Sequence, residues 1–364
     1  MQKEVQTMNK NKIHIVKRDP MVWYKSFLVR AVAILASLLV SAIVITVLTK
    51  KNPIQVYSSM IAGAFGTELR IWSLLQNMVI LLCIALALTP AFKMKFWNCG
   101  GEGQVLVGGL ATVLVMVFLG DTLPYPVLIL VMIAASILAG ILWAVIPAFF
   151  KAMWNTNETL FTLMMNYIAI QLVAYFLKVY VKNGSGVLAP MPELGLPNLF
   201  GKAYLLNIVT VAVLTALVYI YLKKTKHGYE ISVVGESENT ARYIGINVSK
   251  VVIRTLIVSG ALCGIAGLLL VGGTDHTIST GTVGGRGFTA IMVSWLAKFN
   301  PIYMVFTSFL IVFFEKGAGQ ISTDFRIPAA ISDIITGIIL FFIIGCEFFL
   351  QYKILVSKSG KEND

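Results

Sequence analysis

Residues 96–104, Phe-Trp-Asn-Cys-Gly-Gly-Glu-Gly-Gln, combine polar side chains with three glycines. Asn98, Glu102 and Gln104 supply hydrogen-bond donors and acceptors, which suit the recognition of hydroxyl groups or nucleobase edges. Each glycine costs a helix about 1 kcal/mol relative to alanine, so helical structure should be interrupted here. Within a bilayer, interrupted backbone persists only where it is buried in protein or lines a wet cavity. Two interpretations stay open: the lining of a pathway, or a turn between two helices.

A second glycine-rich stretch, residues 272–287, contains Asp275, His276 and Arg286. A phosphate-binding loop needs the pattern G-x-x-x-x-G-K-[ST], and the stretch lacks the lysine. That pattern occurs nowhere in the chain, and no pairing of a nucleophile with a base is recognisable, so no enzymatic chemistry is expected. The stretch is expected to be an outer loop that closes a pathway; a metal site or proton relay at Asp275-His276 is the alternative.

The elements that position these residues follow from composition. Of the 364 residues, 57% are hydrophobic and 13% are charged, against about 25% charged in soluble domains. Apolar runs near 20 residues are long enough to cross a bilayer as helices. The sequence therefore predicts an all-α polytopic membrane protein with about ten transmembrane segments, at 31–48, 71–90, 103–119, 125–146, 160–181, 203–222, 251–271, 288–297, 301–315 and 331–350.

The eighth segment, 288–297, is too short to cross alone and is expected to be part of a broken helix or a re-entrant segment. Similar glycine-rich tetrads, at 100–103 and 284–287, precede the third and eighth segments. Transporters are often built from inverted repeats whose interrupted helices meet near the midplane. An inverted repeat and a chance likeness explain the tetrads equally well.

The basic residues predict the orientation. Placing the N-terminus inside assigns 20 Lys and Arg residues to the cytosolic side and 9 to the outer side, as the positive-inside rule requires. We therefore expect cytosolic tails at 1–25 and 353–364, no cleaved signal peptide, and a membrane domain over 26–352. The net charge of +12 is explained by these short loops, so nucleic acid is not an expected partner, whereas membrane lipid is. Four widely spaced cysteines lack the spacing of metal ligands.

Polar residues also occur inside the apolar segments. Gln76 and Asn77 lie in the second segment, and Asn166 and Gln171 lie in the fifth. Such groups must face other helices or a cavity, so bonding between helices and lining of a pathway are equally plausible. Acidic residues within the segments are few, which disfavours coupling to protons or sodium.

Residues 223–254 form a charged island in the apolar chain, with a cytosolic loop expected over 223–250. Six basic and three acidic residues fall within it. A polar insert of this size is either a solvated connector or a contact surface for another molecule.

Several motifs in the same order resemble those of bacterial ATP-binding-cassette importer permeases of the nucleoside and simple-sugar branch. Residues 98–104 resemble the signature N-[IC]-G-[AG]-E-G-Q, and residues 162–169 resemble the fifth-helix motif of that family. Residues 228–245 are similar to its cytosolic stretch, and Asn300-Pro301 fits the break before its ninth helix. The likeness covers roughly residues 25–350.

The resemblance implies a non-enzymatic permease subunit in the cell membrane, driven by a separate ATPase that binds ATP and magnesium. An external substrate-binding lipoprotein and a second permease, related or identical, are the other implied partners. Nucleosides are the implied substrate, with ribose-like sugars as the alternative, and transport would proceed by alternating access. The implied residues along the pathway are Asn98, Glu102, Gln104 and Asn166. The implied docking face for the ATPase comprises Gly228, Tyr229, Gly235, Glu236, Asn239, Ala241, Arg242 and Gly245.

Two rival functions stay open. An ion-coupled secondary transporter would need no ATPase, and a membrane-embedded enzyme would convert its substrate without moving it.

Overall fold

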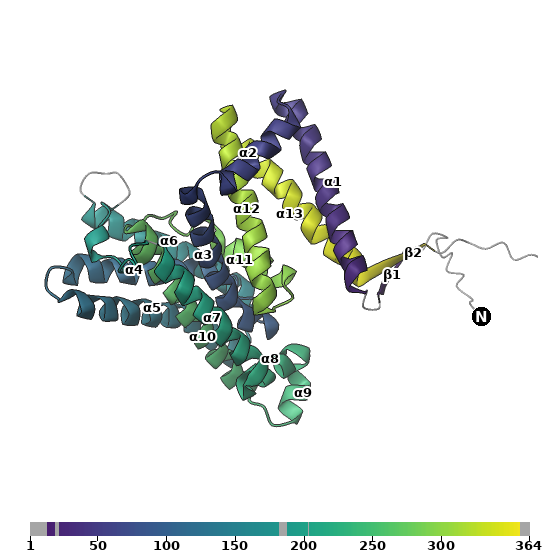
Figure 1. The fold of residues 1–364 in the computed structure, drawn as a ribbon. Coiled ribbons are helices and arrows are strands. Elements are labelled where there is room, and N and C mark those ends of the chain that lie inside the picture. The colour runs from purple at the N-terminus through teal and green to yellow at the C-terminus, as the bar shows by residue number, and fades with distance from the viewer. Residues whose placement is uncertain (1–12, 19–21, 182–187, 203, 357–364) are drawn as a thin grey trace, which may run out of the picture. The chain divides into compact units, whose positions relative to one another are not determined.

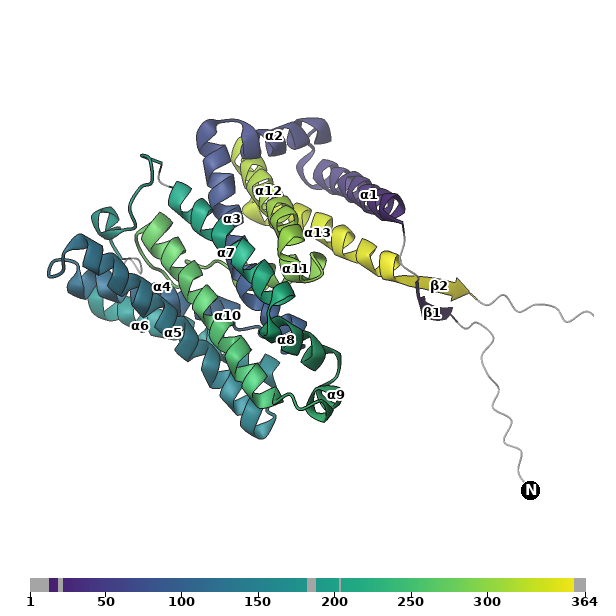
Figure 2. The same cartoon turned by 60° about the horizontal axis from the view of Figure 1, so that its bottom comes forward.

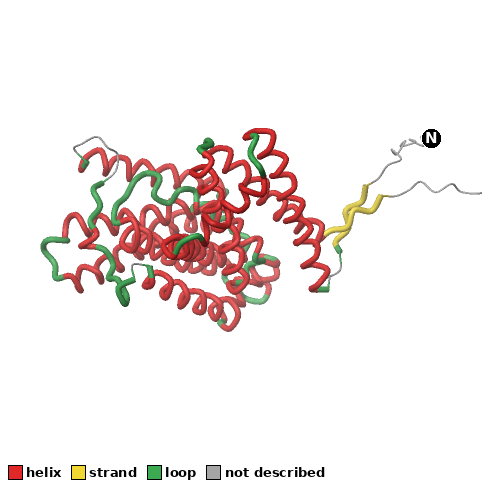
Figure 3. The backbone as a smooth tube through the Cα atoms, turned by 45° about the horizontal axis from the view of Figure 1, so that its top comes forward, coloured by secondary structure: helices red, strands yellow, loops and turns green. Residues whose placement is uncertain are grey.

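A computed structural model of the chain describes residues 13–18, 22–181, 188–202 and 204–356. Helices dominate these residues, and one short pair of strands accompanies them (Figure 3). The chain divides into two units, residues 65–313 and residues 1–64 with 314–364. The division passes through α12 (Pro301–Phe325) and through the last residue of α2 (Pro53–Phe65).

The unit formed by residues 65–313 contains most of the long helices (Figure 1). Its elements are α3 (Glu68–Lys93), α4 (Gly101–Leu119), α5 (Tyr125–Trp154), α6 (Glu158–Tyr180), η1 (Pro192–Leu194), α7 (Leu205–Lys224), α8 (Lys226–Glu236), α9 (Glu238–Tyr243), α10 (Val248–Leu270), η2 (Val271–Asp275), α11 (Arg286–Leu296) and the first part of α12.

The other unit contains the two ends of the chain. Its elements are β1 (Ile13–Lys17), α1 (Trp23–Thr49), α2 (Pro53–Phe65), the last part of α12, α13 (Ala329–Gln351) and β2 (Tyr352–Val356). Helices α1 and α13 pack together, and Arg30 forms an ion pair with Glu347 at 2.6 Å. Strands β1 and β2 pair antiparallel, so both ends of the described chain lie on one side of this unit.

Among the described residues, nine helices are long and apolar enough to cross a membrane. They correspond to nine of the ten predicted segments. The remaining segment is α11, whose 11 residues extend about 16 Å, roughly half the hydrocarbon core. The prediction that this segment is too short to cross alone is confirmed. Between α6 and α7, residues 182–187 and 203 lie outside the described residues, and the described part contains one 3-10 turn, η1.

Helix α10 forms the centre of the larger unit, and most of its residues are buried. It packs against α5, α4 and α3. Small residues allow this packing: a β-carbon on Gly264 would lie 2.2 Å from the Ser136 carbonyl oxygen of α5, and one on Gly260 would lie 2.4 Å from the Gly140 carbonyl oxygen. Backbones that approach so closely are typical of helix contacts in membranes.

Candidate functional site

The segment between α3 and α4 contains the first polar motif of the sequence. Its turn is held by α6, because Thr162 Oγ1 accepts a hydrogen bond from the Cys99 amide at 3.2 Å. Asn166 contributes both halves of its side-chain amide: Nδ2 donates to the Cys99 carbonyl at 2.9 Å, and Oδ1 accepts from the Gly103 amide at 2.8 Å. Asn166 thereby fixes the backbone on both sides of the point where α4 begins.

Asn98 and Gln104 bind each other across the same turn. Gln104 Nε2 donates to Asn98 Oδ1 at 3.1 Å, and Asn98 Nδ2 donates to Gln104 Oε1 at 3.3 Å. Asn98 Nδ2 also lies 3.3 Å from the hydroxyl of Ser259 in α10. Asn98 is 0% and Gln104 is 1% exposed, so this polar pair is enclosed and its hydrogen bonds satisfy buried groups that would otherwise be costly.

Glu102 connects α4 to α11. Its Oε1 accepts a hydrogen bond from the Gly285 amide at 2.8 Å, and its Oε2 accepts one from the Gly287 amide at 2.8 Å. A β-carbon on Gly287 would lie 2.4 Å from the Glu102 amide nitrogen, so glycine is required for this approach. Arg286, which lies between these two glycines, donates a hydrogen bond from Nη2 to Asn77 Oδ1 of α3 at 2.7 Å.

The two helices that meet at Glu102 run in opposite directions. Helix α4 runs parallel to α10, since Gly108 lies against Gly264 and Gly109 lies against Val271. Helix α11 runs parallel to α3, since Arg286 binds Asn77 and the Ser294 hydroxyl binds the Ala85 carbonyl.

Helix α3 in turn runs antiparallel to α10, since Cys83 lies beside Leu262 and Gln76 lies beside Thr274. The two glycine-rich tetrads of the sequence are therefore neighbours in space. The inverted repeat that they suggested stays a prediction.

The four predicted pathway residues are thus brought together around the start of α4. Asn98, Gln104 and Asn166 are buried, and each is bonded to other protein groups, whereas Glu102 is partly exposed. Contact with substrate stays a prediction for all four. Of the other polar residues singled out, Gln171 is exposed on α6.

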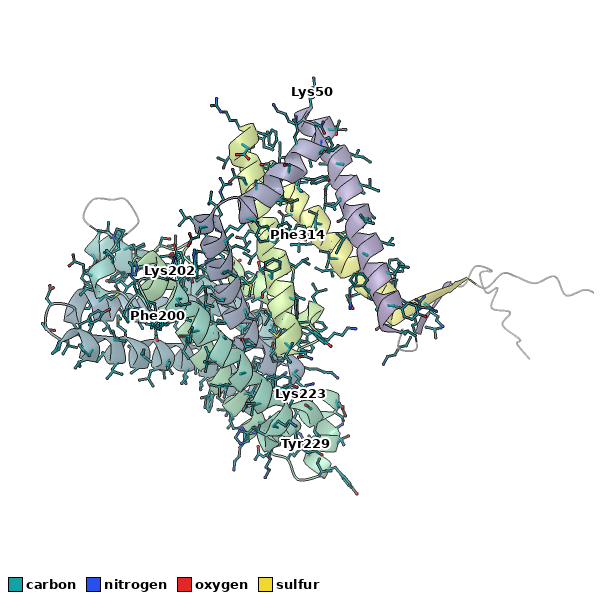
Figure 4. All side chains as sticks on the ribbon, in the orientation of Figure 1. Lys50, Phe200, Lys202, Lys223, Tyr229 and Phe314 are labelled. Atoms are coloured by element: carbon teal, nitrogen blue, oxygen red, sulfur yellow. The ribbon has the colours of Figure 1, made fainter. Side chains whose placement is uncertain are left out.

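Residues 223–250 include two short helices, α8 and α9, which lie between α7 and α10 at one end of the larger unit (Figure 2); Figure 4 labels Lys223 and Tyr229 there. Thr225 and Ser237 cap α8 and α9, accepting hydrogen bonds from the amides of Gly228 and Thr240. After α9, Gly245 has a φ of +84°, and the Gly245 and Ile246 amides bond the Arg242 and Ala241 carbonyls. This pattern closes α9 with a left-handed turn that favours glycine.

The predicted docking residues divide into two groups in the structure. Gly228, Gly235 and Ala241 are buried: a β-carbon on Gly235 would lie 2.1 Å from the Lys93 carbonyl at the end of α3, and one on Gly228 would lie 2.4 Å from the Leu222 carbonyl. The members that a partner could touch are the exposed ones, Tyr229, Glu236, Asn239, Arg242 and Gly245.

Sequence reasoning missed two apolar members of this surface. The side chain of Tyr243 is 92% exposed and that of Ile244 is 50% exposed. A bulky aromatic residue in a polar loop is the signal that could have identified Tyr243, since tyrosine is enriched at the energetic centres of interfaces.

Two cavities flank these short helices. One, of about 460 Å³, lies between α8 and the start of α10 and is lined by Tyr229, Glu230, Lys250 and Arg254 among others. The second, of about 430 Å³, lies between the end of α5, α9 and α10, where Trp154, Glu238 and Arg242 contribute to its wall. A Glu230–Arg254 ion pair joins α8 to α10 across the first cavity.

The chain matches the family described as branched-chain amino acid transport system / permease component over residues 70–344. It is 27% identical to the glucose ABC transporter permease protein TsgB13 of Haloferax volcanii, over 91% of this chain and 90% of that protein. It is 29% identical to the guanosine ABC transporter permease protein NupP of Bacillus subtilis, over 87% of this chain and 92% of that protein. It is 26% identical to the nucleoside ABC transporter permease protein NupB of Lactococcus lactis, over 93% and 96% of the two chains.

The match extends over most of the chain and both units, and the sequence motifs predicted the same kind of protein. The chain belongs to the branched-chain amino acid transport system / permease component family and is a non-catalytic, multi-pass permease subunit of an ATP-binding-cassette importer of the cell membrane.

Proposed function

We propose that this permease moves nucleosides across the membrane by alternating access, driven by a separate ATPase that docks on α8 and α9. The observation that carries the proposal is that one side of these helices is exposed while the opposite side packs tightly against α3 and α7. Tyr229 and Tyr243 are exposed, whereas Gly235 touches α3 and Gly228 touches the end of α7.

This combination suits the transmission of force. A partner that displaces α8 must also displace the end of α3, because no space separates Gly235 from the Lys93 carbonyl. The Glu230–Arg254 ion pair extends the connection to α10, which packs against α3, α4 and α5. Movement at the docking surface would thus reach the helices whose starts meet at Glu102.

The proposed assembly has three further parts. The count of basic residues predicts that α8 and α9 lie in the cytosol, where an ATPase that binds ATP and magnesium would reach them. A substrate-binding lipoprotein on the outer side would deliver the substrate. A second permease, related or identical to this one, would complete the pathway.

Nucleosides are preferred over sugars for two reasons. NupP and NupB, whose names specify guanosine and nucleoside transport, match most of this chain, and the Gly-Glu-Gly-Gln stretch at 101–104 resembles that of the longer members of the nucleoside and simple-sugar branch. A glucose permease, TsgB13, is as similar as these two, so simple sugars are the second candidate. Uptake by the complete transporter should be inhibited more strongly by a panel of nucleosides than by glucose and free pentoses. The reverse order would favour the sugar function.

The docking surface can be tested by co-purification with the ATPase. Replacing Tyr229 and Tyr243 by serine should reduce the bound ATPase about tenfold or more, because exposed aromatic residues commonly dominate interfaces. The matched control is Tyr175→Ser on α6, which removes a 70% exposed tyrosine far from α8 in the sequence. Unchanged ATPase binding by the double variant would reject this surface and indicate that the ATPase contacts another part of the permease.

A further inference from the structure

Three polar side chains from α3, α7 and η2 converge inside the larger unit, apart from the turn at residues 98–104. The side-chain amides of Gln76 and Asn207 both point their nitrogens at the hydroxyl of Thr274. Asn207 Nδ2 lies 3.4 Å from that hydroxyl and also donates to the Leu269 carbonyl at 3.1 Å. Gln76 is 3% and Asn207 is 1% exposed.

The hydrogen bonds of this cluster leave two acceptors unpaired. Thr274 donates its one hydroxyl proton to the Leu269 carbonyl, and both amide nitrogens act as donors. Gln76 Oε1 and Asn207 Oδ1 are buried and accept no hydrogen bond. Rotating either amide by 180° does not remove the deficit, because Thr274 has a single proton to give and an NH2 group would then lack an acceptor. An unpaired buried carbonyl costs about 1–3 kcal/mol, so two in one cluster call for an explanation.

The backbone beside the cluster is unusual. Residues 271–275 form a π-helical turn at the end of α10, and such turns are frequent at functional sites. Within it, a β-carbon on Gly273 would lie 2.5 Å from Asn207 Oδ1, so the main chain is pressed against the unpaired oxygen.

The chemistry of the cluster restricts what could bind there. Two uncharged carbonyl oxygens attract a ligand that donates hydrogen bonds. They are too few for a hard cation such as calcium, which takes six to eight oxygen ligands. A neighbouring pair of hydroxyl groups fits, because both amides converge on one hydroxyl and their oxygens belong to a single small cluster.

We propose that Gln76, Asn207 and Thr274 bind the vicinal hydroxyls of the sugar ring of the substrate during translocation. This inference rests on the proposed function, and it applies to nucleosides and to simple sugars alike because both carry such hydroxyls. In this structure the two oxygens are enclosed by protein. The substrate hydroxyls would reach them only when α3, α7 and η2 separate, which is a movement of the kind that alternating access requires.

The test compares substrates with and without the hydroxyl pair in the complete transporter, with its ATPase and binding protein, in proteoliposomes. Gln76→Met and Asn207→Leu retain the volume of the side chains and remove the unpaired oxygens. Each should lower kcat/KM for uridine about tenfold and that for 2′,3′-dideoxyuridine less than about twofold. Glucose and 2-deoxyglucose form the second pair of probes. The binding protein is the same in wild type and variant. A change in the ratio of kcat/KM between the substrate with the hydroxyl pair and the substrate without it therefore originates in the permease.

Asn77→Leu is the matched control, because this adjacent amide is fully paired: Oδ1 accepts from Arg286 and Nδ2 donates to the Ser73 carbonyl at 2.7 Å. This control substitution should lower uptake of the substrate with the hydroxyl pair and uptake of the substrate without it by the same factor. Equal losses for both members in Gln76→Met and Asn207→Leu would overturn the site and leave a purely structural cluster, with the proposed function intact. A wild-type complex that transports no member of a ribonucleoside panel and no simple sugar would overturn both proposals.

Discussion

Glu102 and Gly287 join the starts of two helices, with 2.8 Å between the carboxylate Oε2 and the main-chain amide nitrogen. The start of each helix carries the equivalent of about half a positive charge, so two adjacent starts repel each other. The carboxylate of Glu102 lies between α4 and α11 and also accepts the Gly285 amide. One side chain thus provides hydrogen bonds for α11 and a counter-charge for both helices.

Glu102→Gln should therefore destabilise the protein although the side chains are similar in size. The substitution removes the charge and turns an NH2 group toward one of two main-chain donors. We expect the free energy of unfolding to fall by about 3 kcal/mol, because hydrogen bonds to charged groups contribute about 1.5–3 kcal/mol each. Thermal unfolding in detergent measures the change. Glu193→Gln, at an exposed carboxylate in η1, is the control. Equal melting temperatures for the two variants would show that Glu102 does not stabilise the contact between α4 and α11.

Gly235→Ala should uncouple the ATPase from uptake. A β-carbon at this position would lie 2.1 Å from the Lys93 carbonyl, so α8 must move away from α3. We expect uptake to fall at least tenfold while ATP hydrolysis continues and the protein still inserts.

Gly245→Ala gives a graded comparison for Gly235→Ala. No atom lies within 4 Å of its added β-carbon, and only the positive φ of 84° is unfavourable, at about 1 kcal/mol. Uptake should then fall no more than about twofold. Coupled transport at the wild-type rate in Gly235→Ala would show that the contact with α3 does not transmit force.

Asn166→Leu should destabilise the turn between α3 and α4. The substitution removes two hydrogen bonds to the main chain and leaves the Gly103 amide and Cys99 carbonyl unpaired. A loss of about 2–4 kcal/mol in the free energy of unfolding is expected. Gln171→Leu, on the same helix at an exposed position, should change it by less than about 0.5 kcal/mol. Similar effects of the two substitutions would show that Asn166 does not hold the turn.

Gly264→Ala should prevent α10 from packing against α5. The new β-carbon would lie 2.2 Å from the Ser136 carbonyl, and a backbone atom cannot move aside without shifting a whole helix. We expect a loss of folded protein measured by size-exclusion chromatography after extraction. Gly337→Ala in α13, where no atom lies within 4 Å, should have no such effect, and equal recovery of both variants would contradict the close contact.

Much of this architecture was predictable because membrane helices are long and apolar. The apolar segments locate nine long helices, and the shortness of 288–297 correctly distinguishes α11. The glycine-rich tetrads also indicated interrupted helices. Their contact through Glu102 was not predictable, because it depends on the relative placement of helices that are far apart in the sequence.

The sequence was sufficient to predict which residues belong to the candidate sites, but it could not show which of these residues are buried. Gly228, Gly235 and Ala241 belong to the right helices, but one sequence cannot show which side of a short helix faces α3 or α7. The Gln76 and Asn207 cluster illustrates the same limit. Both residues lie within predicted apolar segments, yet only the structure shows that their amides share a single hydroxyl.

The close packing of α10 with α5 and α4 has a consequence for biosynthesis. Helix α5 ends at Trp154 and α10 begins at Val248, so α6, α7, α8 and α9 are translated between them. At 5–20 residues per second, the ribosome needs on the order of ten seconds to reach α10. During that time the small-residue faces of α4 and α5 have no native partner. The nascent chain therefore depends on the insertion machinery or on lipid to shield these faces until α10 enters the membrane.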